Sequence, residues 1–98
     1  MNQLSITVGK FRVTNISRCG VEHVDIKEGV SLEKENPIGC SWSVLAFIRF
    51  NQREGEVFYD CVGTRLTDNV DASEWSTVKE LLECGVKIVE TANRELDD

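Results

Sequence analysis

The chain of 98 residues carries 17 acidic and 11 basic side chains, which give it a formal net charge of −6. With 41% hydrophobic and 29% charged residues, its composition is typical of one globular domain, residues 1–98, rather than of a disordered chain. The acidic balance argues against direct binding of nucleic acid, because phosphate recognition requires clustered lysine and arginine side chains.

The first part of the chain, residues 4–16, holds two short runs of alternating apolar and polar residues on either side of Gly9-Lys10. Across the glycine, the apolar residues change from even-numbered to odd-numbered positions. Either a tight turn between two strands or a single bulged strand explains this shift.

A weaker strand is expected next, over residues 21–29, and Val30 and Leu32 extend it or pair with it. Residues 33–39 contain three alternating charges, the only proline and a glycine, which together predict a loop. This loop divides the β-rich part of the chain, residues 4–66, in two.

The strongest predicted strand covers residues 40–50, and its apolar side chains on both faces indicate a central place in the sheet. A turn at residues 51–55 and a partner strand at residues 56–66 complete an antiparallel hairpin, in which Gly63 is expected to mark a bulge. One face of the first strand is expected to hold Trp42, Val44, Ala46, Ile48 and Phe50, and the other Leu45 and Phe47.

The most regular pattern lies in residues 71–96, where apolar residues recur three and four positions apart, as in a helix packed against a core. The helix is expected to start at Asp71 or Ser73, and Asp71 as the N-cap places Glu74 where the two form a capping box. Gly85 lets a neighbouring backbone or aromatic ring come close, and we expect a large sheet residue, such as Phe47 or Tyr59, opposite it. The apolar stripe consists of Trp75, Val78, Leu82, Gly85, Val89, Ala92 and Leu96, broadened by Leu81 and Ile88.

The sequence predicts no metal site, no cofactor and no catalytic residue. The four cysteines, Cys19, Cys40, Cys61 and Cys84, lack the close pairs that structural zinc sites use, so we interpret them as reduced thiols. The only histidine, His23, has no nucleophile motif near it, and the glycines form no phosphate-binding loop.

Asp60 is the one acid inside a hydrophobic strand, between Tyr59 and Cys61. A carboxyl group acts as a general acid or base when it is desolvated or crowded in a cleft. Lone acids in strands more often point outward or pair with a neighbour, and we favour this interpretation for Asp60.

The first residues lack the basic and apolar stretches of a signal peptide, and no segment approaches the ~20 apolar residues of a membrane span. We therefore expect a cytoplasmic protein that does not associate with membranes. Reduced cysteines agree with this compartment.

Strand-like runs followed by a helix predict an α+β fold, an antiparallel sheet of four to six strands with one long C-terminal helix packed on one face. One helix covers one side of such a sheet, so the other side and the flank of the helix are expected to bind a partner. The candidate interaction residues are Trp75, Leu81, Gly85, Ile88, Phe47, Asp60 and His23.

The predicted function is that of a small acidic, non-enzymatic interaction protein, a binder or inhibitor of a larger protein that also self-associates as a homodimer. Its acidic surface suits a partner with a basic surface. Small acidic proteins of this size commonly serve as toxin antidotes or as virus-encoded blockers of host defence, and this analogy concerns the class of function alone.

Two other functions remain open on the sequence. One is a small enzyme or ligand-binding protein whose pocket lies between sheet and helix or across a dimer, with His23, Asp60 or a cysteine in it. The other is mimicry of nucleic acid by the acids of the helix and turns, which predicts binding that weakens steeply with salt. Aromatic residues beside basic ones, as at Phe11-Arg12 and in Phe47-Ile48-Arg49-Phe50, also suggest a stacking platform for single-stranded nucleic acid, but the acidic balance weighs against it.

Overall fold

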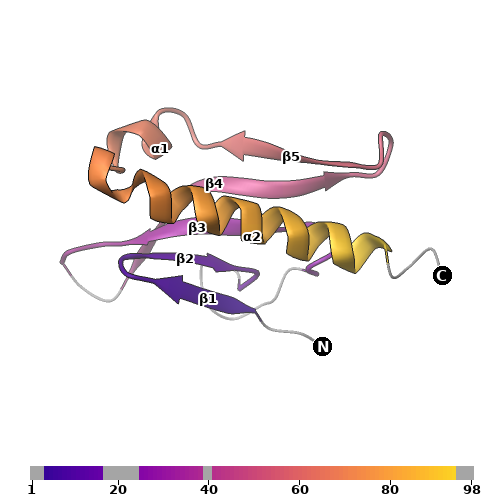
Figure 1. The fold of residues 1–98 in the computed structure, drawn as a ribbon, viewed down its shortest axis with the longest axis horizontal. Coiled ribbons are helices and arrows are strands. Elements are labelled where there is room, and N and C mark those ends of the chain that lie inside the picture. Colours follow the sequence, from indigo (N-terminus) through magenta and orange to yellow (C-terminus); the bar gives the residue numbers. More distant parts are fainter. Residues whose placement is uncertain (1–3, 17–24, 39–40, 95–98) are drawn as a thin grey trace.

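In the computed structural model, which describes residues 4–16, 25–38 and 41–94, five strands form one antiparallel sheet and a long helix packs on one face of it (Figure 1). This arrangement confirms the predicted α+β fold class. The strands follow chain order across the sheet. The elements are β1 (Ser5–Val8), β2 (Phe11–Thr14), β3 (Gly29–Glu35), β4 (Trp42–Asn51), β5 (Glu56–Cys61), α1 (Arg65–Asp68), the 3-10 turn η1 (Ala72–Glu74) and α2 (Trp75–Arg94).

Strands β1 and β2 form a hairpin, which decides between the two alternatives for residues 4–16. Gly9 and Lys10 make the two-residue turn between the strands, and Gly9 has the positive φ (61°) that such turns favour. The turn resets the alternation, so that Ile6 pairs with Val13 on the same face of the sheet.

The prediction of a strand over residues 21–29 is wrong for most of its described part. Residues 26–28 form a turn, in which the Asp25 carboxylate accepts a hydrogen bond from the Lys27 backbone N–H (3.0 Å). The Asp25 carbonyl accepts a second one from the Glu28 N–H (2.9 Å). Aspartate favours turns because its side chain bonds the backbone two residues on. Residues 21–24 lie outside the described part of the chain.

The loop predicted for residues 33–39 is wrong in its first half, because β3 continues to Glu35. Alternation along β3 places Leu32 on the face under the helix and Glu33 on the other face. Arg12 on β2 lies directly across the ladder from Glu33. An opposite charge across the ladder stabilises a glutamate in a strand, although the local run of charges suggests a loop.

A β-bulge at Leu45 divides β4 into two parts with opposite alternation. Leu32 pairs with Ala46, whereas the next residue of β3, Glu33, pairs with Val44, so that Leu45 is the extra residue. The predicted division of faces is therefore wrong on one side of the bulge. Leu45, Ala46, Ile48 and Phe50 face the helix, whereas Trp42, Val44 and Phe47 face away from it.

Strand β5 ends at Cys61, five residues before the predicted end at Leu66. Gly63 has a positive φ (55°), a conformation that glycine adopts without a steric penalty, and the chain turns there into α1. Gly63 thus ends the strand instead of forming a bulge within it.

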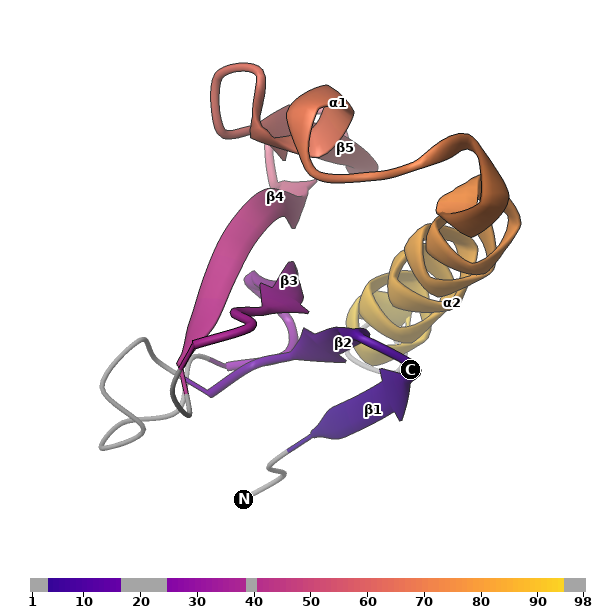
Figure 2. The same cartoon turned by 90° about the vertical axis from the view of Figure 1, so that its left-hand side faces the viewer.

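Helix α2 covers one face of the sheet, and no helix of the described residues covers the other (Figure 2). The predicted capping interaction precedes it, because the Asp71 backbone N–H donates to the Glu74 carboxylate (3.1 Å). The buried residues of α2 are Val78, Leu81, Gly85 and Val89, which join Phe11, Val13, Val30, Leu32, Leu45 and Ile48 of the sheet in one core.

Gly85 lets α2 approach β3 and β4 closely. A Cβ atom built on it would overlap Cδ1 of Ile48 and lie 3.3 Å from Cγ2 of Val30. A large sheet residue therefore does lie opposite Gly85, as predicted, but it is Ile48 and not Phe47 or Tyr59. Alternation places Ile48 under the helix and points its neighbour Phe47 to the far face, while Tyr59 is an exposed residue of β5.

Candidate functional site

The face of the sheet turned away from α2, here called the open face, gathers charged and aromatic side chains from four strands. They lie together because residues paired across an antiparallel ladder share a face. Its members are Arg12 on β2, Ser31 and Glu33 on β3, Trp42, Val44, Phe47 and Arg49 on β4, and Phe58 and Asp60 on β5.

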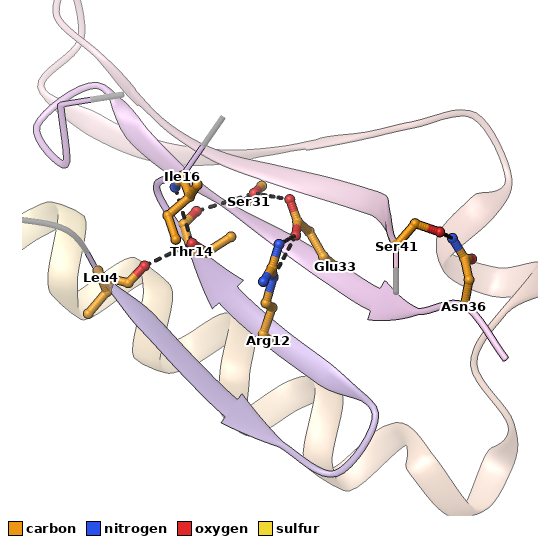
Figure 3. Close-up of polar contacts among 8 residues, drawn as sticks. All are labelled: Leu4, Arg12, Thr14, Ile16, Ser31, Glu33, Asn36 and Ser41. Carbon is orange, nitrogen blue, oxygen red and sulfur yellow. Dashed lines mark hydrogen bonds and ion pairs between the residues drawn. The ribbon is translucent and has the colours of Figure 1, made fainter. Parts of the chain in front are cut away.

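A buried ion pair joins Arg12 and Glu33 on the open face (Figure 3). Both Nε and Nη2 of Arg12 lie 2.7 Å from Oε1 of Glu33, whose side chain is 4% exposed against 20% for Arg12. The Ser31 hydroxyl lies 3.0 Å from Oε2 of Glu33 and 3.2 Å from the Thr14 carbonyl oxygen. Both carboxylate oxygens therefore have partners, which offsets the cost of burying the charge.

The same polar network reaches the first strand through Thr14, which is fully buried. Its hydroxyl donates to the Leu4 carbonyl (2.8 Å) and accepts from the Ile16 backbone N–H (3.1 Å) (Figure 3). Among the described residues, no buried side-chain nitrogen or oxygen lacks a hydrogen-bond partner. The network therefore holds the strands together.

Two arginines of the open face stack on aromatic rings. The Arg12 guanidinium lies 4.2 Å from the centroid of the Trp42 ring, and that of Arg49 lies 4.5 Å from the Phe47 ring. Arg49 also forms an exposed ion pair with Asp60, whose Oδ2 lies 3.4 Å from the arginine Nε. Asp60 is therefore exposed and paired with a neighbour, as its sequence context predicts.

A cavity of about 270 Å³ opens on this face beside the buried ion pair. Apolar walls with a few polar groups are typical of pockets that receive a ligand or a side chain of a partner. Its lining includes Thr14, Ser31, Glu33, Val44, Phe47 and Arg49.

The structure brings two of the candidate interaction residues together, since Phe47 pairs with Asp60 across β4 and β5. Leu81 and Gly85 are buried between α2 and the sheet, where they contribute to the core. His23 lies outside the described residues.

The two remaining candidates lie on α2, away from the open face. Trp75 is exposed at the first position of the helix. Ile88 is half-buried and, with Cys84, lines a shallow hollow on the helix surface. These two residues do not form one site with Phe47 and Asp60.

Four residues of the open face, Arg12, Glu33, Trp42 and Arg49, are not among the candidate interaction residues predicted from the sequence. The sequence does hold a signal for both arginines, because each stands beside an aromatic residue in a predicted strand. The pattern offers no such signal for Glu33, which falls in a predicted loop, or for Trp42, which the regular alternation assigns to the wrong face.

Among the residues that the structure describes, no group of three or more histidine, cysteine, aspartate or glutamate side chains is placed to hold a metal ion. Cys61 and Cys84 are free thiols, and Cys19 and Cys40 lie outside the described part. Within residues 4–16, 25–38 and 41–94, no helix is long and apolar enough to cross a bilayer.

Comparison of the chain with protein-family models, with curated proteins and with solved structures finds no match in any of the three.

Proposed function

We propose that this chain is a small, cytoplasmic, non-enzymatic interaction protein that binds a larger protein through its open face. The observation that supports this most is the pair of arginine–aromatic stacks, Arg12 with Trp42 and Arg49 with Phe47, on the side of the sheet that no described helix covers. Arginine and aromatic residues are the types enriched at protein interfaces and among their energetic hot spots.

The cavity beside Arg49 gives such a face a place to anchor a partner. Hot spots at interfaces lie in well-packed pockets that exclude water. A cavity of about 270 Å³ between Val44, Phe47 and Arg49 accommodates one apolar side chain of the partner, with the guanidinium at its edge. A binder of this kind inhibits its target when it covers a functional surface, as antidotes and virus-encoded anti-defence proteins do.

The charges around the open face indicate a partner with a basic surface. Arg12 is neutralised by Glu33, and Arg49 by Asp60. Three further acids, Glu28, Glu35 and Glu56, lie at the edge of this face, and no cation of the described residues forms an ion pair with them. These three acids are not neutralised by an ion pair within the described part of the chain, and basic groups on the partner would complement them.

We expect Arg49→Glu to weaken partner binding by about 30-fold or more, the loss of about 2 kcal/mol that defines a hot spot. The reason is that Arg49 is exposed, stacked on Phe47 and placed at the cavity. The partner would be captured from a lysate of the cells that express the protein, identified by mass spectrometry, and titrated against purified wild type and variant.

Lys79→Glu on the exposed surface of α2 is the matched control, because it makes the same change of net charge on the helix side. The control should bind as wild type does. A partner that is lost in Lys79→Glu and retained by Arg49→Glu would place the interface on the helix and contradict the proposal. A slope of affinity against salt that is as steep as that of nucleic-acid binding would favour mimicry instead.

A second function, binding of a small ligand, is favoured by the cavity alone, whose size is close to that of the smallest ligand pockets. It predicts that a thermal-shift screen of small compounds finds stabilising ligands, and that Arg49→Ala abolishes their effect. Phe58→Ala, on the open face but outside the cavity lining, should keep it. Compounds that stabilise both variants equally would not bind in this cavity.

A further inference from the structure

Strand β5 lies at the edge of the sheet with half of its backbone groups turned outward. The Val62 N–H bonds the Leu45 carbonyl on β4 (3.1 Å), and Phe47 pairs with Asp60 in the same register. Residues of an antiparallel strand point their N–H and C=O alternately to either side. The groups of Val57, Tyr59 and Cys61 therefore point away from β4, and no strand of the described residues pairs with them.

The edge formed by β5 has little protection. Sheet edges are usually shielded by charged side chains, lysine above all, or by proline, a bulge or a covering segment. The strand contains no lysine, proline or bulge, and the following helix α1 packs against β4. The two charges of β5 are Glu56 and Asp60, of which Asp60 is paired with Arg49. Five of its six residues are exposed, including Phe58 (43%) and Tyr59 (51%) on opposite faces.

The opposite edge, β1, differs in the features that favour pairing. It has four residues against six in β5. The Asn15 N–H bonds the Leu4 carbonyl, so the residues of β1 that turn their backbone outward are Ser5 and Thr7. Tyrosine and valine, which occupy outward positions of β5, are enriched in strands, whereas serine is not.

We propose that β5 pairs antiparallel with β5 of a second copy of this chain, so that two five-stranded sheets become one continuous sheet. When Tyr59 lies opposite Tyr59 of the second copy, the outward-pointing backbone N–H and C=O groups of the two strands face each other. Val57 then lies opposite Cys61 of the second copy, and these positions exchange backbone hydrogen bonds. Both α2 helices lie on the same side of the joined sheet.

Repulsion between acidic side chains favours this register over the two nearest registers that also match the outward-pointing backbone groups. Pairing Phe58 with itself would put Glu56 opposite Asp60, and pairing Asp60 with itself would put two aspartates face to face. Like charges directly opposite each other destabilise a ladder. In the proposed register Phe58 lies opposite Asp60 of the second copy, so the self-pairing strand brings no two acids together.

The first test is the oligomeric state, measured by light scattering and sedimentation over about 1 µM to about 1 mM, because a small interface gives a concentration-dependent dimer. Tyr59→Pro removes an outward N–H and leaves the ladder with β4 intact. We expect its dissociation constant to rise at least about tenfold. Thr7→Pro, the same change at an outward position of β1, should dimerise as wild type does.

Circular dichroism establishes that both proline variants are folded. If Tyr59→Pro does not fold, Tyr59→Lys replaces it in the test. This variant keeps every backbone hydrogen-bonding group and places two like charges opposite each other in the dimer. Thr7→Lys is its control. A wild type that stays monomeric throughout the range would overturn the proposal. So would a folded Tyr59 variant that dimerises as tightly as its Thr7 control.

The register is tested by oxidative cross-linking of cysteine variants, with the linked peptides identified by mass spectrometry. Tyr59→Cys should give a covalent dimer linked between its two copies of position 59, since directly paired residues lie within disulfide reach. Phe58→Cys should not link to itself. A link between two copies of position 58, or between two copies of Cys61, would contradict the proposed register.

Discussion

Arg12→Met is expected to lower the free energy of unfolding by about 3–5 kcal/mol, because it leaves the Glu33 carboxylate buried without its counter-charge. Glu33 is 4% exposed, and its Oε1 receives both nitrogens of Arg12 at 2.7 Å. The Ser31 hydroxyl bonds Oε2 but carries no charge. Since domains of this size are stable by about 5–15 kcal/mol, the loss should be plain in urea denaturation.

Two companion variants distinguish the effect of the unpaired charge on stability from the effect of side-chain packing. Glu33→Leu alone should cost less than Arg12→Met, because Arg12 is 20% exposed, remains stacked on Trp42 and reaches water. Adding Glu33→Leu to Arg12→Met should recover most of the loss, because an apolar pair of similar volume replaces a buried ion pair at little cost. If the double variant were as unstable as Arg12→Met, packing and not the uncompensated charge would be the cause.

The parts of the fold that the sequence predicts are those set by local periodicity. The helical spacing from Val78 to Val89 requires one buried side, and the structure buries that side against the sheet. The hairpin at Gly9 follows from the parity shift around a glycine that takes a positive φ. In each case the deciding residues lie within about two turns of helix or one hairpin, so no long-range contact is needed to recognise them.

The parts that the sequence does not predict depend on pairing between distant residues. Glu33 belongs to a strand because Arg12 lies across the ladder, 21 positions earlier in the chain. Leu45 is a bulge because β3 and β4 pair with a shift there, and a regular alternation has no means of showing it. Each of these two wrong predictions left a residue out of the open face.

The bulge also decides the composition of the candidate site. Without it, Trp42 and Val44 would share a face with Ile48 and lie under α2. With it, Trp42 lies under the guanidinium of Arg12 and Val44 lines the cavity. Bulges re-aim side chains near functional sites. A one-residue irregularity in β4 therefore creates much of the surface on which the proposed function depends.

Gly85→Leu is expected to destabilise the protein by about 3 kcal/mol, at the upper end of the usual cost of overpacking a core. Even a Cβ atom at this position would overlap Cδ1 of Ile48, which is fully buried. The gain in helix propensity over glycine, about 1 kcal/mol, does not offset the displacement of the helix from β3 and β4. Glu83→Leu on the exposed side of α2 should change stability by no more than about 0.5 kcal/mol.

The smaller variant Gly85→Ala locates the steric cause through its coupling to Ile48. Ile48→Val alone should cost about 0.5–1.5 kcal/mol, since it removes a buried methyl group. In the Gly85→Ala background the same change removes the overlapping Cδ1 atom, so its cost should fall by about 1 kcal/mol or reverse sign. Additive effects of the two substitutions in urea denaturation would mean that Ile48 does not limit the approach of α2, and that glycine at position 85 is retained for another reason.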